Sequence, residues 1–192
     1  MDISGLLTVM HFAERLKNIT RHSYTSQNRH ESVAEHCWRL ALLAYFVKDE
    51  FPQADMNKVM LMCLLHDFGE AFEGDIPCFE KSAAHEDAEN RMISAWVSEL
   101  PAPYSLEIKE LLAEMQEHKT LESRLCYALD GIEVVIQHNE ADLSTWNEIE
   151  QELVLKYGED RVDFSDYLVS LRKALKEETA QKLSSIGENI SD

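Results

Sequence analysis

The sequence predicts an all-α fold in a single domain, and three observations point to it. Apolar residues recur every three or four positions along most of the 192 residues, which is the spacing of one face of an α-helix. The chain has 6 glycines and 4 prolines, too few for the many tight turns of a sandwich or barrel. No segment alternates apolar and polar residues as a half-buried strand does. We expect one helical domain over residues 1–183, followed by a polar tail over residues 184–192.

The first helix is predicted over residues 3–16, where the apolar residues form a single stripe. Residues 17–30 are polar and aperiodic, rich in arginine and histidine, and are expected to form a loop. Ser32 and Glu35 then have the spacing of a capping box, in which each side chain binds the backbone N–H of the other residue. A second helix should therefore begin at this serine and end near residue 50.

The next helix, predicted over residues 56–68, is apolar on almost every side, so we expect it at the centre of the core. A loop follows, and the helical pattern then returns and continues to the end of the domain. These later helices are expected over residues 81–100, 106–118, 120–139, 145–157 and 164–183. The residues that should be buried in the 120–139 helix are Leu125, Ala128, Leu129, Ile132, Val135 and Ile136. The acidic run over residues 86–89 should form a solvated face.

The charge of the chain excludes several classes of partner. Lys and Arg total 18 against 36 Asp and Glu, a formal net charge of −18. Such a surface repels nucleic acids and anionic membranes, so we expect neither as a partner. The N-terminus lacks the basic and apolar regions of a signal peptide, and no apolar run is long enough to span a bilayer. The 4 cysteines have no disulfide or metal-binding spacing. We therefore expect a cytoplasmic protein.

Four residues that can bind metals interrupt the apolar helices: His36, the adjacent His66 and Asp67, and Asp130. A single histidine in such a position is usually a hydrogen-bonded core residue. The two aspartates carry more weight, because burying an ionised carboxylate without a partner costs several kcal/mol. One shared cation would satisfy all four residues. Two imidazoles and two carboxylates without a thiolate suit Mn, Co, Fe, Ni, Zn or Mg as the metal.

This order of ligands, each in a helix, resembles the H…HD…D signature of the HD-domain metal-dependent phosphohydrolases. Three stretches are similar to the 5′-deoxynucleotidase-like branch of that family: ESVAEH (31–36), LLHDFGEAFEGDIP (64–77) and ALDGIEVVIQ (128–137). The resemblance covers residues 3–180. It implies a helical HD-domain bundle, usually dimeric, that hydrolyses deoxynucleoside 5′-monophosphates with a divalent cation such as Co, Mn or Mg. We accordingly expect a homodimer and a small nucleotide substrate.

The resemblance also implies roles for residues beside the metal ligands. Glu70 matches the catalytic glutamate of the family, and helical spacing places it on the same face as Asp67. There it would orient or deprotonate the attacking water. Asp75 matches an aspartate that lies at the nucleotide sugar, so we expect it to act as general acid or to position the substrate. Pro77, from the same Gly-Asp-Ile-Pro loop, is expected to contact the substrate.

Arg21 lies fifteen residues before His36, where the family carries an arginine that meets the phosphate. A guanidinium suits this role because its fork binds phosphate oxygens in pairs. Arg29 is an alternative for the same role. The bacterial nucleotidases place a tryptophan after their arginine, whereas this chain has His22, which we count among the substrate-binding residues. This difference leaves the preference for deoxyribose open.

Two other functions remain open on the sequence. One is another HD-domain phosphohydrolase, such as a nucleotide diesterase or a polyphosphate hydrolase. Alarmone hydrolases carry HD-x-x-ED, whereas here Ala71 follows Glu70, and triphosphohydrolases are normally longer and more basic. The other is a nucleotide-binding HD protein without turnover. The presence of every predicted ligand and of Glu70 argues against it.

Overall fold

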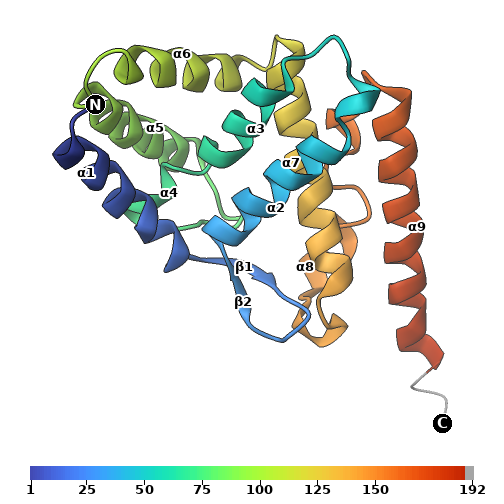
Figure 1. Ribbon diagram of the computed structural model, residues 1–192. Helices are drawn as coiled ribbons and strands as arrows, with labels where there is room; N and C mark the ends of the chain where they lie inside the picture. Colours follow the sequence, from blue (N-terminus) through green and yellow to red (C-terminus); the bar gives the residue numbers. More distant parts are fainter. Residues whose placement is uncertain (189–192) are drawn as a thin grey trace. The chain divides into compact units, whose positions relative to one another are not determined.

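The computed structural model describes residues 1–188, and helices dominate this part of the chain (Figure 1). The predicted all-α class is confirmed. The α-helices in chain order are α1 (Ile3–Glu14), α2 (Val33–Phe46), α3 (Met56–Leu65), α4 (Glu70–Glu73), α5 (Ala83–Ser98), α6 (Tyr104–Glu117), α7 (Leu121–Glu140), α8 (Glu148–Leu153) and α9 (Asp166–Glu188). The 3-10 helices are η1 (Arg15–Lys17), η2 (Lys48–Glu50), η3 (Leu143–Thr145) and η4 (Glu159–Arg161). The strands of one small sheet are β1 (Thr20–Tyr24) and β2 (His30–Ser32).

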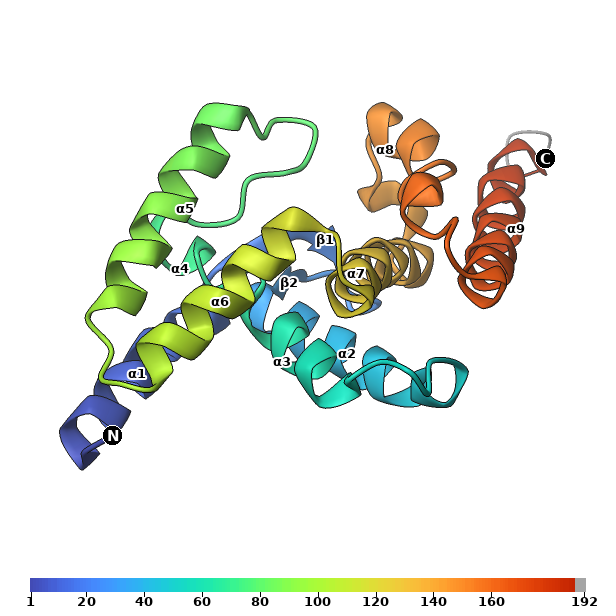
Figure 2. The same ribbon diagram turned by 90° about the horizontal axis from the view of Figure 1, so that it is seen from above.

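The chain forms two compact units. The first contains Met1–His22 and Glu31–Cys126, and the second contains Ser23–His30 and the chain from Tyr127 onward. Within the first unit, α2 and α3 pack side by side, and α5 and α6 are joined by a short turn (Figure 2). Within the second unit, the Gln137 side chain on α7 donates a hydrogen bond to a backbone carbonyl at the end of β1. No helix within residues 1–188 is long and apolar enough to cross a membrane.

The core of the first unit fixes the two segments that carry the predicted histidine ligands. A buried cluster joins α1, η1, α2 and α4, and its fully or largely buried members are Phe12, Leu16, Val33, Cys37 and Ala71. The ring of Trp96 on α5 stacks on Phe12 with 4.2 Å between ring centroids. Burying these large apolar surfaces is the main force that holds the helices together. The start of α2 and the segment after α3 are therefore anchored to one common cluster.

The core along α7 agrees closely with the sequence pattern. Of the six residues predicted to be buried, Leu125, Ala128, Leu129, Ile132 and Val135 are fully buried. Ile136 is half-buried. In the second unit, the buried Arg172 on α9 donates to the carbonyls of Val154 and Tyr157, 2.8 Å each. These bonds satisfy buried backbone groups at the end of α8, which would otherwise cost free energy.

Residues 17–30 correct the prediction most clearly, because the expected loop contains a β-hairpin. Thr25 N–H donates to the Arg29 carbonyl at 2.8 Å, and Val33 N–H donates to the Ile19 carbonyl at 3.0 Å. Asn28 takes a left-handed backbone conformation at the turn, which asparagine tolerates better than most residues. The strands escaped detection because β1 shows no alternation of buried and exposed residues. Their side chains serve polar contacts instead of a core.

Several expected helix ends also differ from the structure: α2 ends at Phe46 instead of near residue 50, and α8 covers Glu148–Leu153 of the expected 145–157. α3 ends at Leu65, before residue 68, and its Leu61 and Leu64 are 45% and 44% exposed, so this helix is not buried on every side. α9 runs to Glu188, past residue 183. Residues 189–192 of the predicted tail lie outside the described residues.

The capping box at the start of α2 is confirmed and supports a stability prediction. The Ser32 hydroxyl accepts from Glu35 N–H at 3.3 Å, and Ser32 N–H donates to the Glu35 carboxylate at 2.8 Å. Replacing an N-cap serine with alanine typically costs about 1 kcal/mol. Ser32→Ala should therefore lower the free energy of unfolding by about that amount in urea denaturation. Ser170→Ala, at an exposed position on α9, should change it by less than about 0.5 kcal/mol. Equal effects of the two substitutions would contradict this role of the cap.

Candidate metal centre

The start of α2 holds the first predicted ligand. The capping box fixes where the helix begins, and His36 lies in its first turn with a fully buried side chain. Cys37, beside it, belongs to the buried cluster of the first unit. A helix position next to a packed core restricts the rotamers of the imidazole, so the ring is held in one place before any ligand binds.

His66 and Asp67 follow directly at the end of α3, where the chain turns toward α4. The Nδ1 atom of His66 lies 3.0 Å from the Cys63 carbonyl. A carbonyl oxygen only accepts, so Nδ1 must carry a proton, and Nε2 is the ring atom left for another partner. This backbone contact is typical of metal-binding histidines, where it orients the ring and fixes the tautomer.

Three donor atoms meet in a small triangle. The Nε2 atoms of His36 and His66 are 3.3 Å apart, and the Asp67 Oδ2 atom lies 3.1 Å from His66 Nε2 and 3.8 Å from His36 Nε2. Ligand atoms about 2.1 Å from one ion, at octahedral or tetrahedral angles, lie about 3.0 to 3.4 Å from one another. The triangle therefore fits a divalent ion of this size with little movement, and it requires no thiolate.

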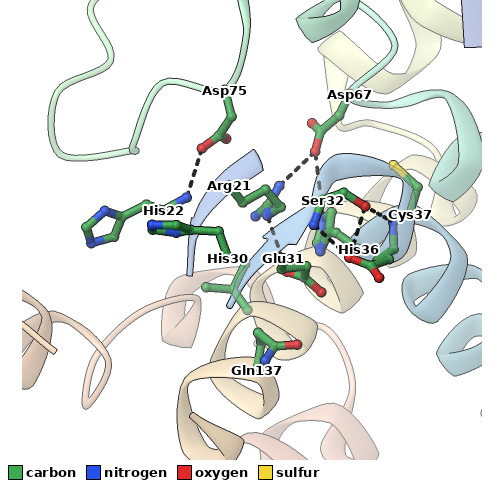
Figure 3. A network of polar contacts seen from close by, with 12 residues as sticks. Arg21, His22, His30, Glu31, Ser32, His36, Cys37, Asp67, Asp75 and Gln137 are labelled. Carbon is green, nitrogen blue, oxygen red and sulfur yellow. Dashed lines mark hydrogen bonds and ion pairs between the residues drawn. The ribbon is translucent and has the colours of Figure 1, made fainter. Parts of the chain in front are cut away.

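The charges around this triangle determine the ionisation state of Asp67. Figure 3 shows that the Arg21 guanidinium reaches Asp67 from β1, with 3.0 Å from Nη1 to Oδ2. Burial alone would raise the pKa of Asp67, but the charge and hydrogen bond of His66, together with Arg21 and His36, lower it well below its usual range. The carboxylate is therefore ionised at neutral pH, as a metal ligand must be.

Arg21 is itself held from β2. Its Nε atom lies 3.6 Å from the Glu31 carboxylate, which is 3% exposed (Figure 3). The structure brings Arg21 to the two histidines and Asp67. Arg29 is exposed in the second unit, where its Nη1 atom donates to the His30 carbonyl. The contact of Arg21 with Asp67 leaves no signal in the sequence, because 46 positions separate the two residues.

Glu70 begins α4 and is 5% exposed. One of its carboxylate oxygens, Oε2, is buried without a hydrogen-bond partner. Burial, and next the negative charges of Asp67 and Asp75, raise the pKa of Glu70 to about 10. A strongly raised pKa beside a cluster of metal-binding groups is typical of a group that transfers protons in catalysis.

The loop after α4 carries the remaining predicted residues of the first unit. Gly74 has φ of 95°, a conformation that glycine adopts without strain, and Asp75 follows it. The Asp75 carboxylate accepts from His22 N–H at 3.3 Å, so the loop is tied to β1 (Figure 3). The His22 ring meets Phe79 edge-on, with centroids 5.4 Å apart. Pro77 is half-buried, and its carbonyl accepts from two N–H groups of the following turn.

Asp130 belongs to the second unit, on α7. Its Oδ2 atom accepts from Arg161 Nη1 at 2.9 Å, and this arginine also packs over the Tyr127 and Tyr157 rings. The sequence predicts a metal cation as the partner of the Asp130 charge. Arg161, from η4, supplies a positive charge that spacing along one helix could not reveal.

The donor set suits a divalent cation, and the helical fold holds the three donors in one place. The chain belongs to the HD domain family, whose sequence model matches residues 13–171 and so covers parts of both units. It is similar to the 5′-deoxynucleotidase HDDC2 of Homo sapiens, with 28% identity over 144 residues, 71% of this chain and 68% of the relative.

Two solved structures share the fold. A predicted metal-dependent phosphohydrolase from Magnetospirillum magnetotacticum has a TM-score of 0.78 and 22% identity, over 94% of this chain and 93% of that chain. The HD phosphohydrolase DatZ of cyanophage S-2L, in a structure bound to dA and one catalytic Zn2+ ion, has a TM-score of 0.59 and 16% identity, over 91% and 96%. The family match and the similarity to HDDC2 place the chain among the HD-domain phosphohydrolases, a class of enzymes that uses a divalent metal.

The triangle predicts a metal-dependent gain in stability. An ion that binds only the folded chain stabilises it by about 2.7 kcal/mol at a concentration 100 times its Kd. Adding Mn2+ should therefore raise the Tm of the wild type, whereas His66→Ala and Asp67→Asn should abolish the increase relative to their own metal-free Tm. The control is His11→Ala, at an exposed position on α1, which should keep the full increase. An unchanged shift in the His66 and Asp67 variants would exclude this site.

The raised pKa of Glu70 predicts how stability depends on pH without metal. Between its ordinary value of 4.5 and about 10, the folded chain keeps a proton that the unfolded chain releases. Glu70 therefore lowers the stability of the fold as pH rises through this window. Glu70→Gln cannot ionise, so in EDTA at pH 8 it should be more stable than the wild type by at least about 1.4 kcal/mol, the value of one pKa unit.

This gain should disappear as the pH is lowered toward 4.5 in urea denaturation curves. Glu73→Gln, at an exposed position on the same helix, should show no such gain. A Glu70→Gln effect that does not change with pH would contradict a raised pKa.

Proposed function

We propose that this enzyme hydrolyses nucleoside 5′-monophosphates, deoxynucleotides above all, to a nucleoside and phosphate. The observation that carries the proposal is the triangle of His36, His66 and Asp67 with Arg21 beside it. Donor atoms that suit a metal and a side chain that suits a phosphate thus occur in one small site. The similarity to the 5′-deoxynucleotidase HDDC2 supports the choice of substrate.

A divalent ion bound to these three side chains would polarise the phosphoryl group and favour ionisation of the attacking water. Asp130 stays a sequence-based prediction as a fourth ligand. Nitrogen and carboxylate donors suit Co, Mn and Mg, which we propose first, with Fe, Ni and Zn as alternatives. Zinc is the catalytic ion of the related DatZ structure.

Arg21 is proposed to bind the substrate phosphate. Its guanidinium forms ion pairs with the carboxylates of Asp67 and Glu31. With its charge neutralised, Asp67 would attract Arg21 less strongly, and the guanidinium would then be available to phosphate oxygens. A planar fork can then bind two oxygens and stabilise the charge that develops on the phosphoryl group.

Glu70 and Asp75 are proposed to handle protons. Both carboxyl groups lie in the first unit, and the negative charge of Asp75 contributes to the raised pKa of Glu70. Glu70 would orient the attacking water and accept its proton, once positive charge nearby lowers its pKa. Asp75 would donate a proton to the departing 5′-oxygen or position the sugar. Enzymes commonly assign the acid and base roles to two carboxyl groups whose different environments give them different pKa values.

The neighbouring residues His22 and Pro77 are proposed to contact the sugar or base, from β1 and from the loop that Asp75 ties to it. A homodimer and a cytoplasmic location remain predictions from the sequence. An HD-domain diesterase or polyphosphate hydrolase is the alternative, and the products distinguish it. A monoesterase releases orthophosphate alone, whereas the alternatives release pyrophosphate, triphosphate or a nucleotide.

The test is phosphate release from a panel of deoxynucleoside and nucleoside 5′-monophosphates, each with Co2+, Mn2+, Mg2+ or no metal. We expect orthophosphate from the deoxynucleotides, loss of activity in EDTA, and a reduction of at least about 100-fold in kcat for Glu70→Ala, which is the lower limit for losing a general base. Glu73→Ala serves as the matched control and should remain active. Full activity of metal-loaded, folded Glu70→Ala would contradict the assigned role. No orthophosphate from any monophosphate would reject the proposed substrate class.

A further inference from the structure

Besides Arg21, a second basic residue lies close to the turn that carries Asp67 and Glu70. Lys81 follows the Gly-Asp-Ile-Pro loop, and its Nζ atom forms an ion pair of 2.8 Å with the Glu89 carboxylate on α5. Neither side chain is on open surface, because they are 26% and 21% exposed. The sequence pattern had placed Glu89 in a solvated acidic run. Its partial burial shows that this part of α5 faces the protein.

Glu89 lies directly against the backbone between Asp67 and Glu70. A Cβ atom on Gly69 would come within 2.6 Å of Glu89 Cγ and 2.7 Å of its Oε1 atom. Such distances are shorter than van der Waals contact, so the close approach depends on glycine at this position. The pair of Glu89 and Lys81 is thus packed onto the same turn that carries Asp67 and Glu70.

Electrostatics agrees with this placement. Burial lowers the pKa of Lys81, but the hydrogen bond and charge of Glu89, followed by the charges of Glu70 and Asp67, raise it overall. Lys81 therefore carries a full positive charge at neutral pH, where the ionised Asp67 attracts it. Arg21 and Lys81 bring positive charge to this acidic region from two separate segments, β1 and the loop before α5.

We propose that Lys81 is a second cationic contact for the substrate phosphate, and that Glu89 is the residue that positions it. The proposal rests on the monophosphate function proposed above. A lysine is a compact charge on a flexible stem, so it can turn from a carboxylate to a phosphate dianion without a change in the backbone. Glu89 limits where the ammonium group can go, which keeps it beside the turn that contains Gly69.

The chain offers a matched control for this pair. Lys58 on α3 and Glu114 on α6 form an ion pair of 2.7 Å with side chains that are 33% and 22% exposed. The charges that raise the pKa of Lys58 come from Glu114, Glu122 and Asp55, none of which belongs to the candidate site. Lys58→Ala therefore removes the same chemistry at similar burial without removing charge near Asp67.

The experiment is calorimetric titration of inorganic phosphate into the Mn2+-loaded protein, combined with kinetics on the monophosphate that is hydrolysed best. Lys81→Ala should weaken phosphate binding about tenfold, as expected for one charged hydrogen bond. It should raise KM by a similar factor and change kcat less. Lys81→Arg should restore most of the affinity, and Lys58→Ala should match the wild type. Glu89→Gln should give an intermediate loss, because the lysine remains but is held less firmly.

Phosphate affinity that is the same in Lys81→Ala, Lys58→Ala and the wild type would overturn the proposal. So would a wild type that does not bind phosphate, or a Lys81→Arg variant as weak as Lys81→Ala. The titration does not depend on turnover. If the wild type binds phosphate through Lys81 but hydrolyses no nucleoside monophosphate, the proposed function fails and the phosphate contact stands.

Discussion

Two imidazole nitrogens and a carboxylate oxygen are held within 4 Å of one another in this protein, and much of the first unit serves that arrangement. Lone pairs at such distances repel unless a proton or a metal cation lies between them. His36 is fully buried, so water cannot relieve the repulsion at its ring. The Arg21 guanidinium moderates it from the side of Asp67, and a divalent cation would do so fully.

This requirement explains why the site is built from the ends of helices and from a hairpin. A helix fixed by a capping box carries His36, and the turn after α3 carries His66 and Asp67. One apolar cluster packs both segments, and this packing holds the donor atoms close to one another. The hairpin brings in Arg21 from outside the helices. The turn that carries His66 and Asp67 also lies close to α5, because Gly69 leaves room for the Glu89 side chain.

The features that can be predicted from the sequence are those that depend on residues close together in the chain. Ser32 and Glu35 have the spacing of a capping box and so indicate where a helix begins. Asp67 and Asp130 stand out because each is a carboxylate in an apolar stretch of sequence, where a buried charge needs a partner. Contacts between segments far apart in the chain have no recognisable sequence pattern. The pairs of Arg21 with Asp67, Arg161 with Asp130 and Lys81 with Glu89 all join separate elements. The hairpin was missed for a related reason, because its side chains make polar contacts and so lack the alternation that a buried face imposes.

The most direct test of this account is a crystal structure of the Mn2+-loaded protein with anomalous scattering data. We predict one strong anomalous peak about 2.1 Å from the Nε2 atoms of His36 and His66 and from the Asp67 carboxylate, a distance typical of such ligands. We also predict that Arg21 no longer pairs with Asp67 at 3.0 Å. A peak bound by other residues, or no peak at saturating Mn2+, would contradict the central claim that these three side chains form the metal site.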